Sequence, residues 1–119
     1  MDETTPRHVR VTATYVSSTT DPVRFRAGEV VAVGRRDQQW TSYVWGTDQA
    51  GRAGWVPEEY LETTAAGEAV ALRDYDATEL TVGHGEHLDV LDEAGGWLLC
   101  RTDAGIVGWV PADHTQALA

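Results

Sequence analysis

The sequence predicts an all-β chain that contains two tandem copies of a small domain. The tetrapeptide Gly-Trp-Val-Pro occurs at 54–57 and again at 108–111, and each copy lies near the end of one half of the 119-residue chain. Self-similarity at a period of about fifty residues is typical of repeated small modules rather than of one larger fold. Short apolar runs bounded by Gly, Pro and polar residues fill the remaining segments, and no amphipathic helix competes with them.

Four strands are expected in each copy, in the same order. They are 9–15, 30–33, 43–45 and 54–56 in the first copy, and 69–72, 87–91, 97–100 and 108–110 in the second. Gly51 and Gly105 are each preceded by Ala and, before it, by a polar Gln or Asp, and they predict tight hairpin turns between the third and fourth strands. Pro57 and Pro111 end the fourth strands, because proline cannot donate to a β-ladder, and a single helical turn is expected after each.

Anchor residues of the two copies define the predicted domain boundaries. Tyr15 corresponds to Tyr75 at an offset of 60, Gly28 to Gly85 at 57, and Gly54 to Gly108 at 54. The two three-residue deletions that these offsets imply are expected in surface loops. The predicted organisation is an N-terminal tail (1–8), domain 1 (9–61), a linker (62–68), domain 2 (69–116) and a C-terminal tail (117–119).

The charge of the chain is strongly negative and unevenly divided. The formal net charge is −10; residues 1–61 contain seven Arg against eight acids, whereas residues 62–119 contain two Arg against eleven. An acidic surface repels phosphate backbones, so nucleic acid is not expected as a partner. Because the linker is short, domain 1, which is richer in Arg, is expected to contact the acidic domain 2.

Nothing in the sequence predicts export, catalysis or a cofactor. The N-terminus lacks the positive start and apolar stretch of a secretory signal, and no segment is long enough to span a membrane, so a cytoplasmic location is expected. Cys100 is the single cysteine, which excludes an internal disulfide, and it is expected to be buried and inert. His84 and His87 have no further His or Cys nearby, so no metal site is predicted. We predict no catalytic residue and a protein that is not an enzyme.

Motifs in both halves resemble Src homology 3 (SH3) domains. The segment 71–75, Ala-Leu-Arg-Asp-Tyr, is similar to the opening of that family, and 79–82 followed by Gly85-Glu86 is similar to its next conserved segment. Trp97 stands where the family has a Trp pair, and 108–114 resembles the closing segment that contains a proline. The first half is a more distant version, and the resemblance covers residues 9–61 and 69–116. It also extends to bacterial variant members, in which paired copies form small stand-alone proteins.

The resemblance implies two five-stranded barrels, each with an aromatic groove that binds a polyproline II segment. Loop acids in the family pair with a basic residue of the peptide. The residues carried over to the domain 1 groove are Tyr15, Asp21, Trp40, Tyr43, Pro57 and Tyr60. Those carried over to the domain 2 groove are Tyr75, Asp76, Glu79, Trp97, Pro111 and His114. The first Tyr of the family's opening motif is replaced by Ala13 in one copy and by Arg73 in the other.

The sequence therefore favours a non-catalytic protein-interaction module. The expected partner is a protein surface or an extended peptide. One form of this prediction is a proline-containing peptide with basic residues. A cell-wall (peptidoglycan) binding module of bacterial SH3 type is an alternative, disfavoured by the missing signal. A nucleic-acid-associated β-barrel is a second alternative, disfavoured by the charge. Neither membrane nor nucleic acid is expected as a partner.

Overall fold

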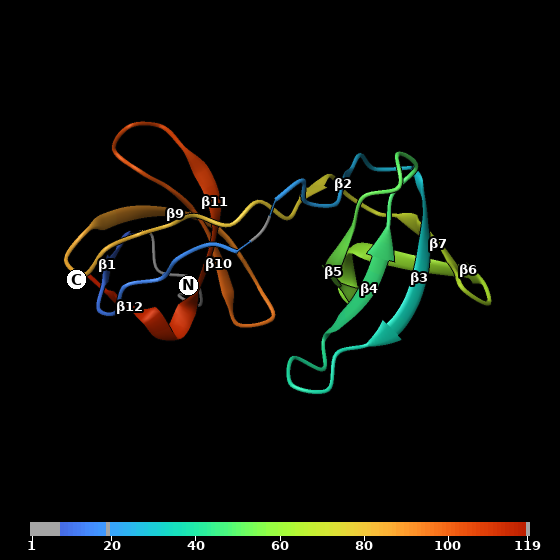
Figure 1. Cartoon of the computed structure of the whole chain (residues 1–119), viewed down its shortest axis with the longest axis horizontal. Helices are drawn as coiled ribbons and strands as arrows, with labels where there is room; N and C mark the ends of the chain where they lie inside the picture. The colour runs from blue at the N-terminus through green and yellow to red at the C-terminus, as the bar shows by residue number, and fades with distance from the viewer. Residues whose placement is uncertain (1–7, 19, 119) are drawn as a thin grey trace, which may run out of the picture. The chain divides into compact units, whose positions relative to one another are not determined.

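A computed structural model describes residues 8–18 and 20–118, and these residues form short β-strands joined by turns (Figure 1). The strands are β1 (His8–Val11), β2 (Arg24–Phe25), β3 (Val30–Arg36), β4 (Tyr43–Thr47), β5 (Ala53–Pro57), β6 (Leu61–Ala65), β7 (Glu68–Ala71), β8 (Tyr75–Asp76), β9 (His87–Ala94), β10 (Trp97–Arg101), β11 (Val107–Pro111) and β12 (Thr115–Ala117). The two predicted helical turns are 3-10 turns, η1 (Glu58–Tyr60) and η2 (Ala112–His114). The all-β prediction is confirmed. No helix in the described part of the chain is long and apolar enough to cross a bilayer.

The described residues form two compact units, each built around a five-stranded antiparallel sheet. Unit 2 is the continuous segment Thr20–Ala77, with strand order β5-β4-β3-β7-β6 and a small second sheet of β2 and β8. Unit 1 combines Met1–Thr19 with Thr78–Ala119, as far as these residues are described, and has strand order β11-β10-β9-β1-β12. In sequence, unit 2 therefore lies inside a loop of unit 1.

These units do not follow the predicted domains 9–61 and 69–116, because the two repeats exchange their first strands. β1, from the first repeat, pairs with β9 and β12 of the second: Val9 lies opposite Leu88 on one side and Ala117 on the other. β7, from the second repeat, pairs with β3 and β6 of the first: Ala69 lies opposite Val31 and Thr63. Figure 1 shows the blue strand β1 in the same sheet as the strands coloured yellow to red.

The predicted linker, 62–68, explains the exchange. Only two residues, Ala66 and Gly67, separate β6 from β7. A connection of two residues joins neighbouring antiparallel strands as a hairpin, and Gly67 has the positive φ of 77° that such turns require. β7 is therefore fixed beside the strand that precedes it in the chain. The place beside β12 is then filled by β1.

Most predicted strands are confirmed, and the largest difference is in the first. Segments 30–33, 43–45 and 54–56 lie in β3, β4 and β5, and their counterparts in the second repeat lie in β9, β10 and β11. The predicted strand 9–15 ends at Val11, and Tyr15 makes only an isolated bridge to Val82. The predicted turns are present: the Gly51 N–H donates to the Asp48 carbonyl and the Gly105 N–H to the Thr102 carbonyl.

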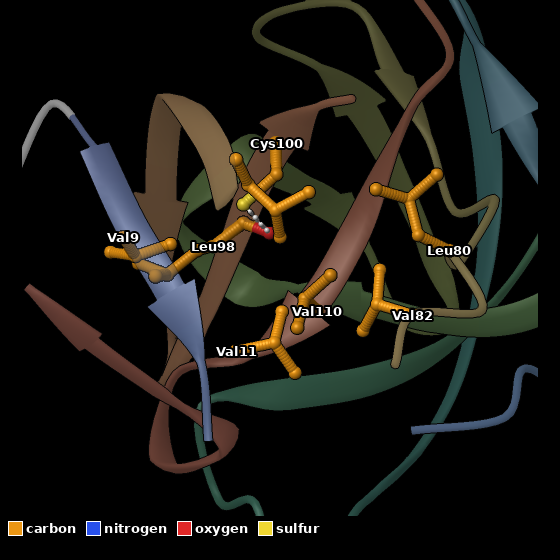
Figure 2. Packing of buried hydrophobic residues seen from close by; sticks show 8 residues of the cluster. Val9, Val11, Leu80, Val82, Leu98, Cys100 and Val110 are labelled. Atoms are coloured by element: carbon orange, nitrogen blue, oxygen red, sulfur yellow. Dashed lines mark hydrogen bonds between the residues drawn. The ribbon is translucent and has the colours of Figure 1, made fainter. Parts of the chain in front are cut away.

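The core of unit 1 shows directly what the exchanged strand contributes. Val9 and Val11 are fully buried beside Leu88, Leu98 and Val110, which come from the second repeat (Figure 2). Each fully buried valine stabilises a fold by roughly 1.5–3 kcal/mol relative to an exposed one. Unit 1 therefore depends on the first repeat for part of its core.

The predicted burial of Cys100 is confirmed. Its side chain is fully buried, its thiol lies 3.7 Å from the carbonyl oxygen of Leu98 (Figure 2), and burial raises its pKa to about 12. Gly46 holds the equivalent place in unit 2. A Cβ at Gly46 would lie 2.8 Å from a methyl carbon of Val56, so this position in unit 2 has no room for a side chain.

Candidate functional site

Unit 1 brings together aromatic residues of both repeats that the sequence assigned to two different grooves. The Tyr15 ring meets the Trp97 ring edge to face at a centroid distance of 5.8 Å, and the His114 ring likewise at 5.5 Å. Trp97 on β10 lies opposite Pro111 on β11, so the two point to the same side of the sheet. Tyr15, Trp97 and His114 are partly exposed, and Pro111 is buried. We call these four residues, together with Glu79, the unit 1 groove.

Glu79 places a carboxylate at this groove. The Tyr15 hydroxyl donates to Glu79 Oε1 at 2.7 Å, and the backbone of Glu79 bridges to Trp109. Burial, together with the hydrogen bond to Glu79 and its charge, raises the pKa of Tyr15 well above its ordinary value. The phenol therefore remains a hydrogen-bond donor at all physiological pH values. One oxygen of Glu79 accepts this bond, and the partly exposed carboxylate carries a negative charge beside the aromatic rings.

The matching residues of unit 2 form a buried cluster. Tyr43 is 6% exposed, Tyr60 2% and Tyr75 8%, and Pro57 is buried as well. The Tyr75 ring meets Tyr60 edge to face at 5.4 Å and Phe25 in a tilted arrangement at 5.6 Å. We call Tyr43, Pro57, Tyr60 and Tyr75 the unit 2 cluster.

Polar contacts hold the unit 2 cluster closed. The Tyr75 hydroxyl donates to the Trp55 carbonyl oxygen at 3.0 Å, and the Arg73 guanidinium lies over the Tyr60 ring, 4.3 Å from its centroid. Burial, followed by the charges of Tyr60 and Glu59, raises the pKa of Tyr43 well above its ordinary value. Arg73 stands where SH3 domains have a tyrosine in the proline pocket, so in unit 2 a cation covers a ring of the expected binding surface.

The strand exchange changes the membership of both predicted grooves. Tyr15 was assigned with Tyr43 and Tyr60 but lies with Trp97 and His114 in unit 1. Tyr75 and Asp76 were assigned with Trp97 but lie in unit 2. This is a correction to both groove assignments. Each of these residues follows its own first strand, and the hairpin between β6 and β7 decides where that strand goes.

The remaining predicted residues of unit 2 lie outside its buried cluster. Asp21 is exposed and has a positive φ of 52°. Asp76 is also exposed, and its backbone lies opposite that of Arg24 in the small sheet of β2 and β8. Trp40 is partly exposed and accepts a backbone hydrogen bond from Tyr43. No residue of unit 2 matches Glu79, because Pro22 holds the equivalent place.

The exchange also evens out the charge. Unit 1 contains three Arg against nine acids and unit 2 six Arg against ten, for net charges of −6 and −4. The asymmetry behind the predicted contact between an Arg-richer and an acidic domain is therefore much smaller between the units. That contact stays a prediction.

Among the described residues, no group of three or more His, Cys, Asp or Glu side chains could hold a metal ion.

Comparison with known protein families matches both repeats. A family model described as a variant SH3 domain matches residues 8–63, and one described as an SH3 domain matches residues 70–112. The chain is a tandem pair of SH3 domains. The matched ranges follow the sequence repeat, so each SH3 repeat contributes its first strand to the barrel that the other repeat completes.

Two curated proteins resemble parts of this SH3 pair. Epidermal growth factor receptor kinase substrate 8-like protein 3 of Mus musculus is 42% identical over 43 residues, which cover 36% of this chain and 7% of that protein. High osmolarity signaling protein SHO1 of Yarrowia lipolytica (strain CLIB 122 / E 150) is 33% identical over 88 residues, which cover 74% of this chain and 28% of that protein. The alignments thus span less than a third of either relative. SH3 domains are protein-interaction modules that recognise extended peptides.

Proposed function

We propose that this SH3 pair binds an extended, proline-containing peptide with a basic residue through the unit 1 groove. The observation that carries the proposal is the grouping of Tyr15, Trp97 and Glu79, which come from three separate segments of the chain. Partly exposed rings provide flat walls for proline side chains, and a polyproline II segment loses little conformational entropy when it binds. Glu79 lies where a basic residue of the peptide would find a carboxylate.

In this proposal unit 2 does not take part in proline recognition. The rings of Tyr43, Tyr60 and Tyr75 are almost fully buried, so binding there would require the cluster to open. Opening would separate Arg73 from Tyr60 and break the hydrogen bond from Tyr75 to Trp55. The proposed pair therefore has one peptide groove, which contains a tyrosine from the first repeat and a tryptophan from the second.

The proposal is tested with the full chain and a fluorescein-labelled peptide, Arg-Ala-Leu-Pro-Ala-Leu-Pro. Fluorescence anisotropy gives the affinity, and the indole N–H signals in nitrogen-15 NMR spectra identify the binding site. We expect the Trp97 signal to shift, because its ring lies in the groove. A peptide with Glu in place of Arg, or with Ala in place of both Pro, is expected to bind much more weakly.

Glu79→Gln tests the acid directly. Glutamine keeps an oxygen that accepts the Tyr15 hydrogen bond but removes the charge, so we expect about fivefold to tenfold weaker binding of the Arg peptide. The matched control is Asp21→Asn, which removes a loop carboxylate from unit 2 at a backbone conformation that Asn tolerates. Equal losses in both variants, or an unshifted Trp97 signal, would contradict the proposal.

The other sequence-based expectations remain predictions. Retention on insoluble peptidoglycan with no binding of the Arg peptide would favour the cell-wall alternative. A salt-dependent shift of a nucleic acid in a gel would favour the second alternative. The cytoplasmic location also stays a prediction.

A further inference from the structure

Unit 2 has, besides its buried cluster, an exposed aromatic surface on the outer face of its main sheet. Trp45 on β4 lies directly opposite Trp55 on β5, and the two rings meet edge to face at a centroid distance of 5.0 Å. Val44 and Val56, which alternate with them along these strands, are buried in the core. Both Trp rings are partly exposed. This surface is separate from the unit 2 cluster and from the unit 1 groove.

A β-bulge places a cation on these two rings. β3 pairs with β4 at Val33 opposite Gly46 and at Arg36 opposite Val44, so Gly34 and Arg35 together occupy the place opposite Trp45. A bulge redirects side chains on the bulged strand. Here the Arg35 guanidinium carbon lies 5.3 Å from the Trp45 ring centroid and 5.2 Å from that of Trp55. We call Arg35, Trp45 and Trp55 the Arg35 surface.

Among the described residues, the neighbouring Arg36 has a carboxylate partner and Arg35 has none. Arg36 binds the Glu58 carboxylate through both terminal nitrogens, at 2.8 and 2.7 Å, and the Thr41 carbonyl at 2.7 Å. Arg35 is exposed, and in the part of the chain that the structure describes its guanidinium contacts the two Trp rings but no carboxylate. Its N–H donors are therefore available to a ligand on the solvent side.

The equivalent place in unit 1 has the opposite charge. The offsets between the repeats relate Arg35 to Asp92, Trp45 to Leu99 and Trp55 to Trp109. Asp92 lies opposite Leu99 in unit 1, which corresponds to the place of Arg35 beside Trp45 in unit 2. Trp109 is buried. The cation and its exposed aromatic support therefore belong to unit 2 alone and do not follow from the fold that both units share.

We infer that the Arg35 surface docks an acidic, extended segment of a partner protein. A planar guanidinium binds a carboxylate through two parallel hydrogen bonds, and a guanidinium that is already held on two rings loses little freedom when it does so. The Trp rings would contact an apolar side chain next to the carboxylate. This inference does not rest on the proposed groove of unit 1, which would select a basic peptide.

The test uses the full chain and a fluorescein-labelled peptide with three Glu separated by Leu and Pro, together with the same peptide carrying Gln in place of Glu. Binding is measured by anisotropy, and the site is identified by the indole N–H signals. We expect the Glu peptide to shift the Trp45 and Trp55 signals and leave the Trp97 signal in place. The Gln peptide is expected to bind at least about tenfold more weakly, because a carboxylate–guanidinium pair is lost.

Variants at the cation complete the test. Arg35→Gln is expected to weaken Glu-peptide binding about tenfold, and Arg35→Lys is expected to be intermediate, because it keeps the charge but not the planar fork. Arg26→Gln, an exposed arginine of the same unit, is the matched control and is expected to bind as the unchanged protein does. Thermal unfolding shows that each variant is folded.

Three results would overturn the inference: no binding of the Glu peptide, undiminished binding by Arg35→Gln, or a shift of Trp97 instead of Trp45 and Trp55. Displacement of the Glu peptide by inorganic phosphate, added so that its total negative charge equals that of the peptide, would also overturn the inference. The surface would then be a general anion site. The Arg peptide supplies an independent reference, since it reports on the unit 1 groove whatever happens at Arg35.

Discussion

The two units share a strand order but expose different chemistry. In unit 1, Tyr15 and Trp97 are partly exposed, and Tyr15 contacts Glu79. In unit 2, the corresponding Tyr75 and Tyr43 are buried, and the exposed aromatic surface lies instead around Arg35. In the two proposals made above, the two copies of one fold offer an acidic and a basic docking surface in one chain. The fold provides the sheet, and a few side chains at equivalent places decide what it binds.

The comparison also concerns how each unit is completed. Unit 2 is continuous in sequence and contains all five strands of its sheet between residues 20 and 77. Unit 1 is discontinuous, because β1, which lies between β9 and β12 in its sheet, precedes unit 2 and its other strands follow unit 2. The two units should therefore differ sharply in whether they fold as single pieces of chain.

The largest expected effect is on isolated fragments. We expect the fragment 20–77 to fold alone, because it contains β6, β7 and the hairpin between them. We expect the fragment 78–119 to remain unfolded, because it lacks Val9 and Val11 from its core and a strand between β9 and β12. Nitrogen-15 NMR spectra of the two fragments give the measurement, with the full chain as reference.

Addition of a synthetic peptide covering residues 8–18 is the control for this experiment. It should restore native signals to the fragment 78–119 and leave the fragment 20–77 unchanged. A folded 78–119 fragment without the peptide, or an unfolded 20–77 fragment, would refute the strand exchange.

A smaller expected difference concerns acid stability and depends on one turn. Between β4 and β5, the buried Asp48 carboxylate accepts hydrogen bonds from the backbone N–H groups of Arg24, Ala50 and Arg52. It also forms an ion pair with the Arg52 side chain. Burial by itself raises the pKa of Asp48, but these contacts outweigh it and the net pKa is lowered. In the equivalent turn of unit 1, Thr102 accepts a hydrogen bond from Ile106 through its hydroxyl.

A carboxyl group whose pKa is lowered by folding contributes stability above its unfolded pKa, and that stability is lost as the pH falls through its folded pKa. We therefore expect unit 2 to lose more stability than unit 1 as the pH drops below about 4, the ordinary pKa of an aspartate. Urea unfolding followed by NMR signals of each unit, at pH 7 and in acid, gives the measurement.

Asp48→Thr copies the turn of unit 1 into unit 2. At neutral pH we expect it to cost unit 2 about 1–3 kcal/mol, because buried N–H groups lose their partner. It should also reduce the acid sensitivity of unit 2. Unchanged acid sensitivity in this variant would show that other groups are responsible.

The smallest expected effect is at Arg73, which lies over Tyr60 in unit 2. Its counterpart in unit 1 is Ala13. We expect Arg73→Ala to lower the stability of unit 2 by about 0.5–1 kcal/mol, the usual size of an exposed cation–π contact. Urea unfolding of the variant and the unchanged protein, followed by NMR signals of each unit, measures this change. The stability of unit 1 is the internal control. A loss confined to unit 1 would be inconsistent with the contact.

Much of the fold could be predicted from local sequence. Short apolar runs at 43–45 and 54–56 identified strands, Gly51 and Gly105 identified the turns between strands, and Cys100 was correctly expected in the core. The family resemblance grouped Tyr15 with Tyr43 and Tyr75 with Trp97, whereas the structure places Tyr15 beside Trp97 and Tyr75 beside Tyr60. The Arg35 surface was missed, although adjacent Gly34 and Arg35 at the end of a strand are a signal for a bulge.

The sequence by itself determined the all-β class, the two SH3 repeats and the positions of most strands. Only the tertiary structure decided which repeat completes which barrel, and which aromatic rings are exposed. The reason is that β1 and β7 have the same burial pattern, so either strand presents suitable side chains to either core. Periodicity specifies a face but not a neighbour. The two-residue hairpin between β6 and β7 determines the neighbour of each exchanged strand. The side chains that then surround each aromatic ring determine how exposed that ring is.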